Sequence, residues 1–524
     1  MDRPLIACAQ LNPITGDLDS NSRNIIDMAQ AAFKADAQVL LTSAYSLPGC
    51  PLGAWGLRRD FLQAQQDQLL AIANASRGFS PLTIVIGIVA DNGQSSLAII
   101  HDGKLVDSVV CGQTRTIPTA RGNLLLATSE DVFSGVVTQQ TVSNAHAVCV
   151  LVSTARTYLN GETERFEDEI KRIAKRLRCP VVVVNRVGAQ DDVIYLGGST
   201  AADASGETIM AMPWLSTGLA YVGCGQSIAR EKPKHIEILY DALVVAVRDY
   251  VHKNGFSSVE LGLSGGVDSA LVAAIAADAV GAENVWTVMM PTRFTAELSL
   301  REAKKLAQNL GVHYEVRVIE PLFKAYMNEL AHDFAGQVWN ETEENLQARI
   351  RGNLLMAYAN KFGRFVLATG NKSESAVGYS TLYGDTAGAY APIKDVFKTE
   401  VWELCREVNR RAGFERIPES IIARAPSAEL REGQIDEASL PAYAVLDAIL
   451  MRYIELGHTP REIIAAGFDV DTVERIVGMV HRNEYKRRQC PVGPRVSLRS
   501  LGVDWEYPMS MSIRYMKESA NITI

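Results

Sequence analysis

The chain has 524 residues, which is too long for one hydrophobic core and predicts two domains. Its composition, 47% apolar and 21% charged, is that of a globular protein, and the formal net charge of −8 argues against nucleic-acid binding as the main function. The N-terminus lacks the basic and apolar regions of a signal peptide, and the apolar stretch 270–280 is broken by Asp278. We therefore expect a cytoplasmic protein with neither membrane nor nucleic-acid partners.

The cysteines are scattered singly, without a CxxC motif and without zinc-type spacing to histidine. This pattern predicts neither a structural metal nor a disulfide framework. The eight positions are Cys8, Cys50, Cys111, Cys149, Cys179, Cys224, Cys405 and Cys490.

Short β-rich runs alternate with amphipathic helices up to about residue 225. The stretch 162–179 predicts a helix with Phe166 and Ile170 on its apolar face, and 195–212 has the pattern of two paired strands around a Ser-Gly turn. The sum predicts an α/β layered domain. Runs typical of buried strands lie at 5–11, 37–43, 82–90, 96–103, 147–153 and 180–188.

A polar stretch at 225–234 contains proline and mixed charge but no apolar period. We place the domain boundary there, with domains at 1–228 and 235–524. Beyond it, a long helix is predicted at 235–255, and further strands and helices alternate. This alternation predicts a doubly wound parallel sheet. Its expected strands lie at 259–263, 285–291, 314–320 and 365–370.

The strongest chemical signal is the segment LGLSGGVDSA at 261–270, between a predicted strand and a predicted helix. Gly265 and Gly266 let the backbone approach an anion, and the helix N-terminus supplies free N–H groups. Asp268 beside an anion indicates a bridging Mg²⁺. No lysine follows at the Walker spacing, so the loop is not a Walker motif. Taken alone, the segment also fits a glycine-rich turn in which Asp and Ser cap the helix.

The segment SGGVDS at 264–269 resembles the pyrophosphatase (PP) loop of enzymes that form adenylates from ATP. Four further motifs, in the same order, resemble the synthetase domain of NAD synthetases, in particular the two-domain glutamine-dependent type. The resemblance implies an adenine nucleotide alpha hydrolase-like (PP-loop ATPase) fold for this half. The motifs lie at 344–363, 367–399, 424–443 and 481–489.

The resemblance implies that the carboxylate of nicotinate adenine dinucleotide (deamido-NAD) attacks ATP. Pyrophosphate leaves with Mg²⁺, and ammonia converts the acyl-adenylate to NAD and AMP, with no covalent residue on the enzyme. The implied ATP site contains Gly262, Leu263, Ser264, Gly265, Gly266, Val267, Asp268 and Ser269, with Thr369, Lys398 and Ser427. The implied Mg²⁺ ligands are Asp268 and Glu374, and the implied deamido-NAD site contains Asn345, Glu374, Asp385 and Lys486.

Each of these residues also has a plainer interpretation when it is taken alone. Glu374 fits a surface acid on a helix, Lys398 fits a solvated face, and the basic run 486–488 is typical of a solvated charge cluster. Their joint spacing within the motifs is what favours the site.

The N-terminal half resembles the nitrilase-type (carbon–nitrogen hydrolase) amidase domain that is fused to such synthetases. The segment 6–25 resembles that family's opening strand, loop and helix, and 181–200 resembles its late NxVGGQD segment, with Ala189 for a glycine. The implied fold is an αββα sandwich.

The catalytic residues of that amidase family are a Glu base, a Lys that stabilises the oxyanion and a Cys nucleophile. At the matching positions this sequence has Ala44, Thr114 and Thr138. We interpret Val136 and Val137 as the end of a strand that leads into Thr138, with the vacated nucleophile position at this threonine. Cys149 lies inside an apolar run and is expected to be buried and inert.

The leading hypothesis is therefore an NAD synthetase that uses free ammonia and carries a pseudo-glutaminase domain, in a homo-oligomer. A second hypothesis keeps glutamine dependence, through unrecognised residues or a separate glutaminase that supplies the ammonia. A third is a non-catalytic scaffold or regulatory subunit, and a fourth is another ATP-dependent amidotransferase of the same loop class. The intact synthetase motifs argue against the last two.

Overall fold

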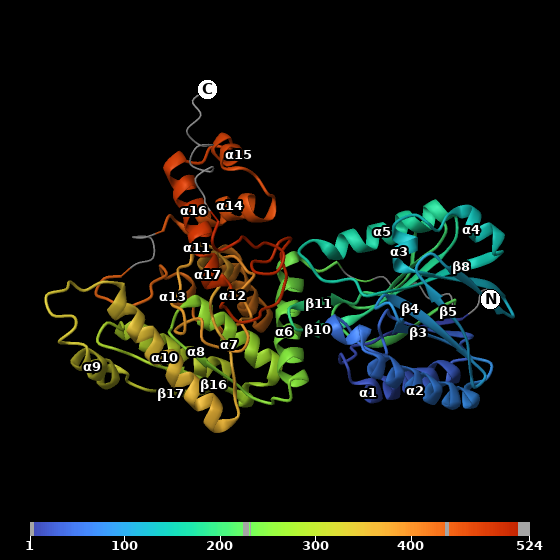
Figure 1. The fold of residues 1–524 in the computed structure, drawn as a ribbon, viewed down its shortest axis with the longest axis horizontal. Coiled ribbons are helices and arrows are strands. Elements are labelled where there is room, and N and C mark those ends of the chain that lie inside the picture. Colours follow the sequence, from blue (N-terminus) through green and yellow to red (C-terminus); the bar gives the residue numbers. More distant parts are fainter. Residues whose placement is uncertain (1–4, 224–229, 231, 435–439, 512–524) are drawn as a thin grey trace. The chain divides into compact units, whose positions relative to one another are not determined.

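The computed structural model describes residues 5–223, 230, 232–434 and 440–511 (Figure 1). The chain divides into two compact units, Met1–Pro233 and Lys234–Ile524. Most of the expected boundary stretch 225–234, Cys224 and positions 435–439 of the third synthetase motif lie outside the described residues. None of the described helices is both long and apolar enough to cross a membrane.

Unit 1 is built from two six-stranded sheets, each covered by helices on one side, and one small sheet of two strands. Its strands are β1 (Ile6–Gln10), β2 (Val39–Thr42), β3 (Thr83–Val89), β4 (Ser95–His101), β5 (Lys104–Val110), β6 (Thr114–Thr119), β7 (Gly122–Thr128), β8 (Ala147–Thr154), β9 (Val181–Asn185), β10 (Val187–Gln190), β11 (Val193–Leu196), β12 (Thr200–Ala202), β13 (Thr208–Ala211) and β14 (Gly218–Val222). Its helices are α1 (Leu18–Lys34), α2 (Arg59–Ser76), α3 (Ser129–Phe133), α4 (Gln139–Asn144) and α5 (Glu162–Leu177).

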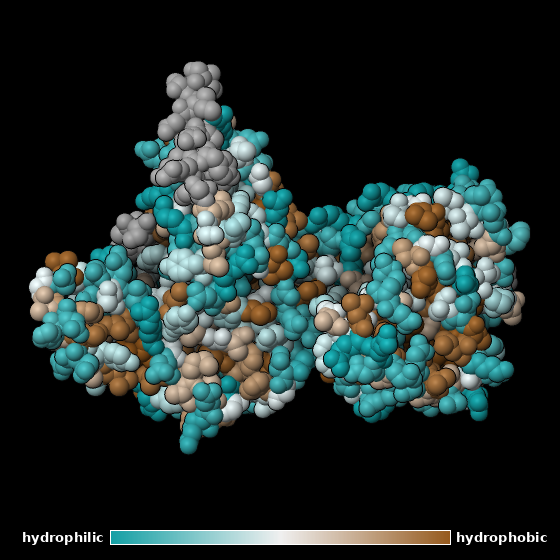
Figure 2. Space-filling model, in the orientation of Figure 1, coloured by the Kyte–Doolittle hydropathy of each residue, from teal (hydrophilic) through white to brown (hydrophobic). Residues whose placement is uncertain are grey.

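The two sheets of unit 1 have the strand orders β14-β1-β2-β3-β4-β5 and β13-β12-β9-β8-β7-β6. Alternate side chains of one strand point to opposite faces. Cys8 and Leu41 therefore pack against Leu126 in the core between the sheets, whereas Leu40 packs in the core that α1 and α2 cover. Where α1 and α2 face solvent, the surface is largely hydrophilic (Figure 2). The expected αββα sandwich is confirmed.

One central strand, β7, was not predicted from the sequence. Its residues, GNLLLAT, include only one β-branched side chain, Thr128, so its strand propensity is low. Tertiary context overrides that propensity, because β7 pairs with β8 on one side and β6 on the other. The strand that we expected at Val136 and Val137 is wrong, because these residues lie in an irregular segment between α3 and α4.

Unit 2 contains a parallel four-stranded sheet in the order β17-β16-β15-β18. The strands are β15 (Val259–Gly262), β16 (Val285–Met289), β17 (His313–Val316) and β18 (Phe365–Val366). The helices around it include α6 (His235–Lys253), α7 (Val267–Val280), α8 (Glu297–Leu310), α9 (Glu320–Glu329), α10 (Glu341–Phe362), α12 (Lys398–Ala412) and α13 (Glu419–Ile422). The remaining helices are α11 (Lys372–Val377), α14 (Tyr443–Leu450), α15 (Pro460–Ala465), α16 (Val470–Arg482) and α17 (Glu484–Arg487), with a π-helix at Met451–Glu455.

In unit 2, successive strands are added on one side of β15 and then on its other side. The chain moves outward from β15 to β16 and β17, and then returns to place β18 on the other side of β15. Such a switch point leaves a crevice at the carboxyl ends of the strands, where ligands of doubly wound sheets bind. The predicted doubly wound parallel sheet is confirmed, and its crevice lies between the residues that follow β15 and those that follow β18.

Candidate active site

The glycine-rich loop 263–266 connects β15 to α7 at the switch point. Gly265 has φ +82°, and a Cβ at this position would lie 2.6 Å from the backbone oxygen of Ser299, so only glycine fits without a shift. Ser264 Oγ lies 3.1 Å from Ser269 Oγ and accepts a hydrogen bond from Gly266 N, which fixes the turn. The N-cap residue of α7 is Gly266, which has no side chain that could accept a hydrogen bond from the first N–H groups of the helix. The helix N-terminus therefore opens toward the crevice with its positive dipole end, as an anion site requires.

Two acidic side chains and one lysine converge beside this loop. Lys398 Nζ forms ion pairs with Asp268 and with Glu374 Oε1, the latter at 3.2 Å. Burial alone would lower the pKa of Lys398, but the two carboxylates outweigh it and hold the pKa above its ordinary value. Asn371 Nδ2 donates to Asp268 Oδ1 at 2.9 Å and ties the loop to α11. The sequence-predicted residues Asp268, Glu374 and Lys398 thus form one cluster.

The same cluster fits a divalent cation that is shared with a phosphate ligand. Asp268 and Glu374 approach a single point, the ammonium group of Lys398, so both could contact one ion. Within the described residues, no group of three or more His, Cys, Asp or Glu side chains could hold a metal by itself. This donor set suits Mg²⁺, which is commonly held by one or two carboxylates together with substrate phosphates.

A second cluster surrounds the segment 378–381. Lys486 Nζ donates to the carbonyl oxygens of Gly378 and Ser380, each at 2.7 Å. Thr381 Oγ1 donates to Asn345 Oδ1, and Thr381 N donates to Asp385 Oδ1 at 2.7 Å. Desolvation inside the site raises the pKa of Asp385 to about 6, although the charge of Lys486 opposes this shift. The structure therefore brings together Asn345, Asp385 and Lys486, while Glu374 belongs to the Lys398 cluster.

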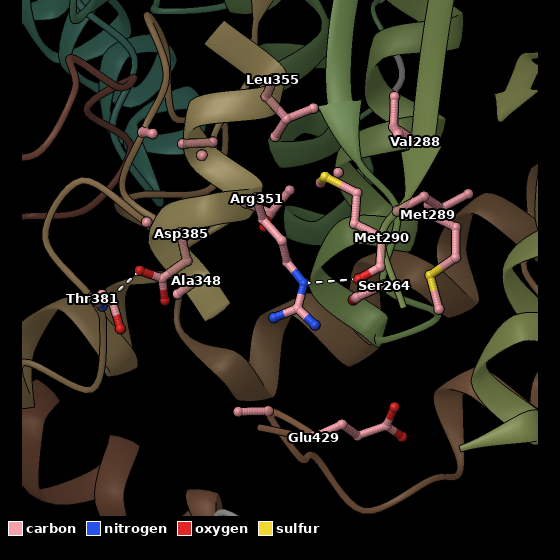
Figure 3. Close-up of a pocket in the computed structure, with 18 of the residues that line it drawn as sticks. Ser264, Val288, Met289, Met290, Ala348, Arg351, Leu355, Thr381, Asp385 and Glu429 are labelled. Carbon is pink, nitrogen blue, oxygen red and sulfur yellow. Dashed lines mark hydrogen bonds between the residues drawn. The ribbon is translucent and has the colours of Figure 1, made fainter. Parts of the chain in front are cut away.

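Two adjoining cavities occupy the crevice. One, of about 210 Å³, is lined by the loop 264–269 together with Glu374, Lys398 and Ser427. The other, of about 240 Å³, is lined mainly by apolar side chains from β16, α10 and the residues after β18 (Figure 3). Five residues line both cavities, so the two join: Ser264, Thr369, Asp385, Ala428 and Glu429. The predicted residues Thr369 and Ser427 thus line the same site as the loop.

In unit 1, the three positions that we matched to amidase residues lie on different elements. Ala44 is buried just after β2, and its N–H donates to Thr154 O at the end of β8. Thr114 begins β6, the last strand of its sheet. Thr138 is exposed and caps α4, where its hydroxyl and that of Thr141 form a capping box.

Sequence comparisons identify relatives of both units. A family model described as NAD synthase matches residues 239–490, and one described as carbon–nitrogen hydrolase matches residues 162–233. The glutamine-dependent NAD(+) synthetase of Acinetobacter baylyi is 38% identical over 535 aligned positions, which cover 96% of this chain and 98% of that protein. The chain belongs to the two-domain NAD synthetase family.

Other members of this NAD synthetase family support the assignment over the whole chain. The glutamine-dependent NAD(+) synthetase of Thermotoga maritima is 35% identical and covers 97% of this chain. The structure of the Acinetobacter baumannii glutamine-dependent NAD⁺ synthetase with ADP matches with a TM-score of 0.75 and 35% identity, over 96% of this chain and 98% of that one. A Cytophaga hutchinsonii synthetase has a TM-score of 0.83 at 18% identity and supports the fold only.

In the hydrolase-like unit of this NAD synthetase, Ser129 follows a strand, whereas Thr138 does not. In parallel sheets, reactive side chains gather where strands end, and Ser129 directly follows β7. Burial and the charges of Cys50 and Glu130 raise the pKa of Tyr45 to about 12, so Glu130 lies near the residue after Ala44. The expected strand before Thr138 is wrong, because the missed strand β7 displaced the comparison to the next apolar pair.

Three thiols of unit 1 are poor candidates for a replacement nucleophile. Cys111 lies 3.6 Å from Asp131 Oδ1, and desolvation together with that carboxylate raises the pKa of its thiol. Cys50 and Cys149 are buried, as expected for Cys149. A thiolate is the reactive form of cysteine, so a raised pKa disfavours catalysis.

Sequence reasoning missed two charged residues of the synthetase unit, Arg351 and Glu429, which line the apolar cavity. The available signal was helical spacing: Ala348, Arg351 and Leu355 share one face of α10, and a charged side chain on an otherwise apolar face is unusual. Glu429 had no such signal, because it lies in an irregular segment with a positive φ.

Proposed function

We propose that this protein makes NAD from deamido-NAD, ATP and ammonia. The observation that carries the proposal is the pair of joined cavities at the switch point of a chain whose NAD synthase match spans residues 239–490. One cavity has the features of a triphosphate site, and the other offers apolar walls for flat rings. We assign the ATP site to the loop 262–269 with Thr369, Lys398 and Ser427.

The deamido-NAD site is assigned to Asn345, Glu374, Asp385 and Lys486. A carboxylate oxygen of the substrate attacks the α-phosphorus of ATP, and the bond to pyrophosphate breaks with its electron pair. Ammonia then attacks the acyl carbon, AMP leaves with the electron pair of the C–O bond, and nitrogen loses a proton. With a pKa of about 6, Asp385 is ionised at neutral pH and suited to accept that proton.

Asp268 and Glu374 would hold Mg²⁺ against the phosphates of ATP. When bound there, the ion would withdraw charge from the departing pyrophosphate. The chain's own contribution is to position the reactants: the loop amides orient the triphosphate, and Lys398 fixes both carboxylates.

The nitrogen source is proposed to be free ammonia. Ala44 cannot act as a base, and the residue after β7 is Ser129 rather than a cysteine. Ser129 Oγ donates a hydrogen bond to the exposed carboxylate of Glu130 at 3.1 Å. The carbon–nitrogen hydrolase model matches only 162–233, beyond all of these positions. A serine without an effective base is a far weaker nucleophile than a thiolate.

Glutamine dependence is the second candidate, because the relatives named above are called glutamine-dependent and align with nearly the whole chain. It would require a nucleophile other than those considered, or a separate glutaminase that delivers ammonia. A homo-oligomer is also proposed. Large apolar side chains are exposed around α9 and α10, among them Leu322, Val338 and Trp339. Hydrophobic residues also gather on this part of the surface of unit 2 (Figure 2).

The proposal is tested by incubating the purified protein with deamido-NAD, ATP, Mg²⁺ and ammonium, and by quantifying NAD, AMP and pyrophosphate. We expect the three products in equal amounts, and we expect Asp268→Asn to reduce their formation by about 10²-fold or more. Asp333→Asn, at an exposed site of the same unit, is the matched control. Absence of NAD with the wild-type protein would refute the proposal.

A further inference from the structure

The joined cavities contain three cationic side chains, and two of them already have partners. Lys398 is paired with Asp268 and Glu374. Arg424 donates to Ser299 Oγ at 2.6 Å and to Glu429 Oε1 at 2.7 Å. These contacts occupy the charged groups of both side chains. The third cation is Arg351.

Arg351 extends from α10 into the apolar cavity, between Asp385 and Ser264 (Figure 3). Its Nε donates to Met290 O at 3.0 Å, which fixes the plane of the guanidinium group. Across the part of the chain that the structure describes, its two terminal nitrogens have no hydrogen-bond or ion-pair partner. Glu429 attracts the charge but lies beyond ion-pair distance. The guanidinium therefore presents unused donors to the cavity.

The reaction in this site brings two anions together. The carboxylate of deamido-NAD must approach an α-phosphate that also carries negative charge, and like charges repel strongly where water is scarce. The α-phosphate has to lie where the triphosphate cavity joins the apolar cavity, near Ser264 and Asp385, which line both. A planar guanidinium can hold one oxygen on each of its terminal nitrogens.

We propose that Arg351 is a catalytic residue that binds the reacting carboxylate and the α-phosphate of ATP with its two terminal nitrogens. It offsets the repulsion between them and stabilises the charge that develops on the α-phosphate oxygens as the new O–P bond forms and the bond to pyrophosphate breaks. The inference rests on the proposed function, and it adds a charged group at the reacting atoms to the residues assigned above.

The test compares Arg351→Gln and Arg351→Lys with Lys361→Gln, which removes one charge from an exposed position of the same helix. With ammonium as the nitrogen source, we expect kcat to fall about 10²- to 10³-fold for Arg351→Gln. Exchange of labelled pyrophosphate into ATP, which reports adenylation alone, should fall in parallel. Arg351→Lys should stay well below the wild type, because an ammonium group lacks the two-pronged donor geometry.

A purely structural role is distinguished by chemical rescue. Millimolar guanidinium should restore part of the activity of Arg351→Ala and leave Lys361→Gln unchanged. If Arg351→Gln raised the KM for ATP with kcat unchanged, Arg351 would only bind adenosine and the inference would be wrong. Wild-type-like exchange or absent rescue would also overturn it. Failure of wild type and Lys361→Gln alike to form NAD would instead refute the proposed function.

Discussion

The site perturbs the ionisation of Asp385. Its carboxyl accepts a hydrogen bond from Thr381 N and lines both cavities, where desolvation raises its pKa to about 6. A raised carboxyl pKa means that the folded state favours the protonated form. The stability from this preference is complete below the ordinary pKa of about 4 and is lost as the pH rises through about 6. At neutral pH the ionised carboxyl therefore destabilises the fold, which is common at functional sites.

Replacing Asp385 with asparagine should separate stability from activity. Asparagine keeps the acceptor for Thr381 N but carries no charge, so we expect a higher Tm than the wild type at pH 8 and no difference at pH 4. We also expect kcat with ammonium to fall about 10²- to 10⁴-fold, because the proton acceptor is removed. Thermal melts at both pH values and ammonium-supported rates measure the two effects. Equal stability shifts at pH 4 and pH 8 would contradict the account, and Asp333→Asn is the control.

At the scale of single elements, a buried ion cluster holds α11 in place. Lys372 is fully buried in the first turn of that helix. Its Nζ contacts Glu455 Oε1 at 2.7 Å, Asp395 Oδ1 at 3.0 Å and Ser497 Oγ at 2.5 Å. These contacts join α11 to the π-helix and to the segment after α17. Because Asn371 and Glu374 lie beside Lys372, the cluster also fixes the residues that face the phosphate loop.

Replacing Lys372 with methionine should be strongly destabilising. The change keeps the volume of the side chain but leaves the buried carboxylate of Asp395 and the partly buried one of Glu455 without their cation, which costs about 3–5 kcal/mol in the free energy of unfolding. Urea denaturation of the full chain measures this loss, with Lys361→Met as an exposed control that should lie within about 0.5 kcal/mol of the wild type. A loss under about 1 kcal/mol for Lys372→Met would show that the cluster does not anchor α11.

Sequence patterns predicted the elements whose geometry depends on local rules. The loop 264–269 was recognisable because the close approach to Ser299 admits only glycine at Gly265, and α5 was recognisable from its apolar face. Strand β7 was missed because buried leucines fit a helix or a strand equally well. Because of that single omission, we compared the end of a strand with Thr138 rather than with Ser129. Arg351 could not be assigned a role either, since only tertiary structure shows which cations lack partners.

At the scale of the whole molecule, the two units have diverged to different degrees. The NAD synthase match covers most of unit 2, whereas the carbon–nitrogen hydrolase match covers only the last part of unit 1. Unit 1 nevertheless keeps both sheets and both cores. A fold is maintained by packing, whereas an activity depends on a few residues placed on it. A silent amidase unit would keep its fold but lose its catalytic residues. Ala44 at the position of the base and Ser129, rather than a cysteine, after β7 fit that description.

The central claim, that the synthetase uses ammonia while unit 1 is silent, is tested most directly by the nitrogen source. Initial rates of NAD formation would be measured with saturating deamido-NAD, ATP and Mg²⁺, in parallel reactions with ammonium or with ammonia-free glutamine. The account predicts NAD formation with ammonium and only the background rate with glutamine. Comparable rates with glutamine, with glutamate released in equal amounts, would contradict it and would mean that unit 1 contains a nucleophile other than those considered.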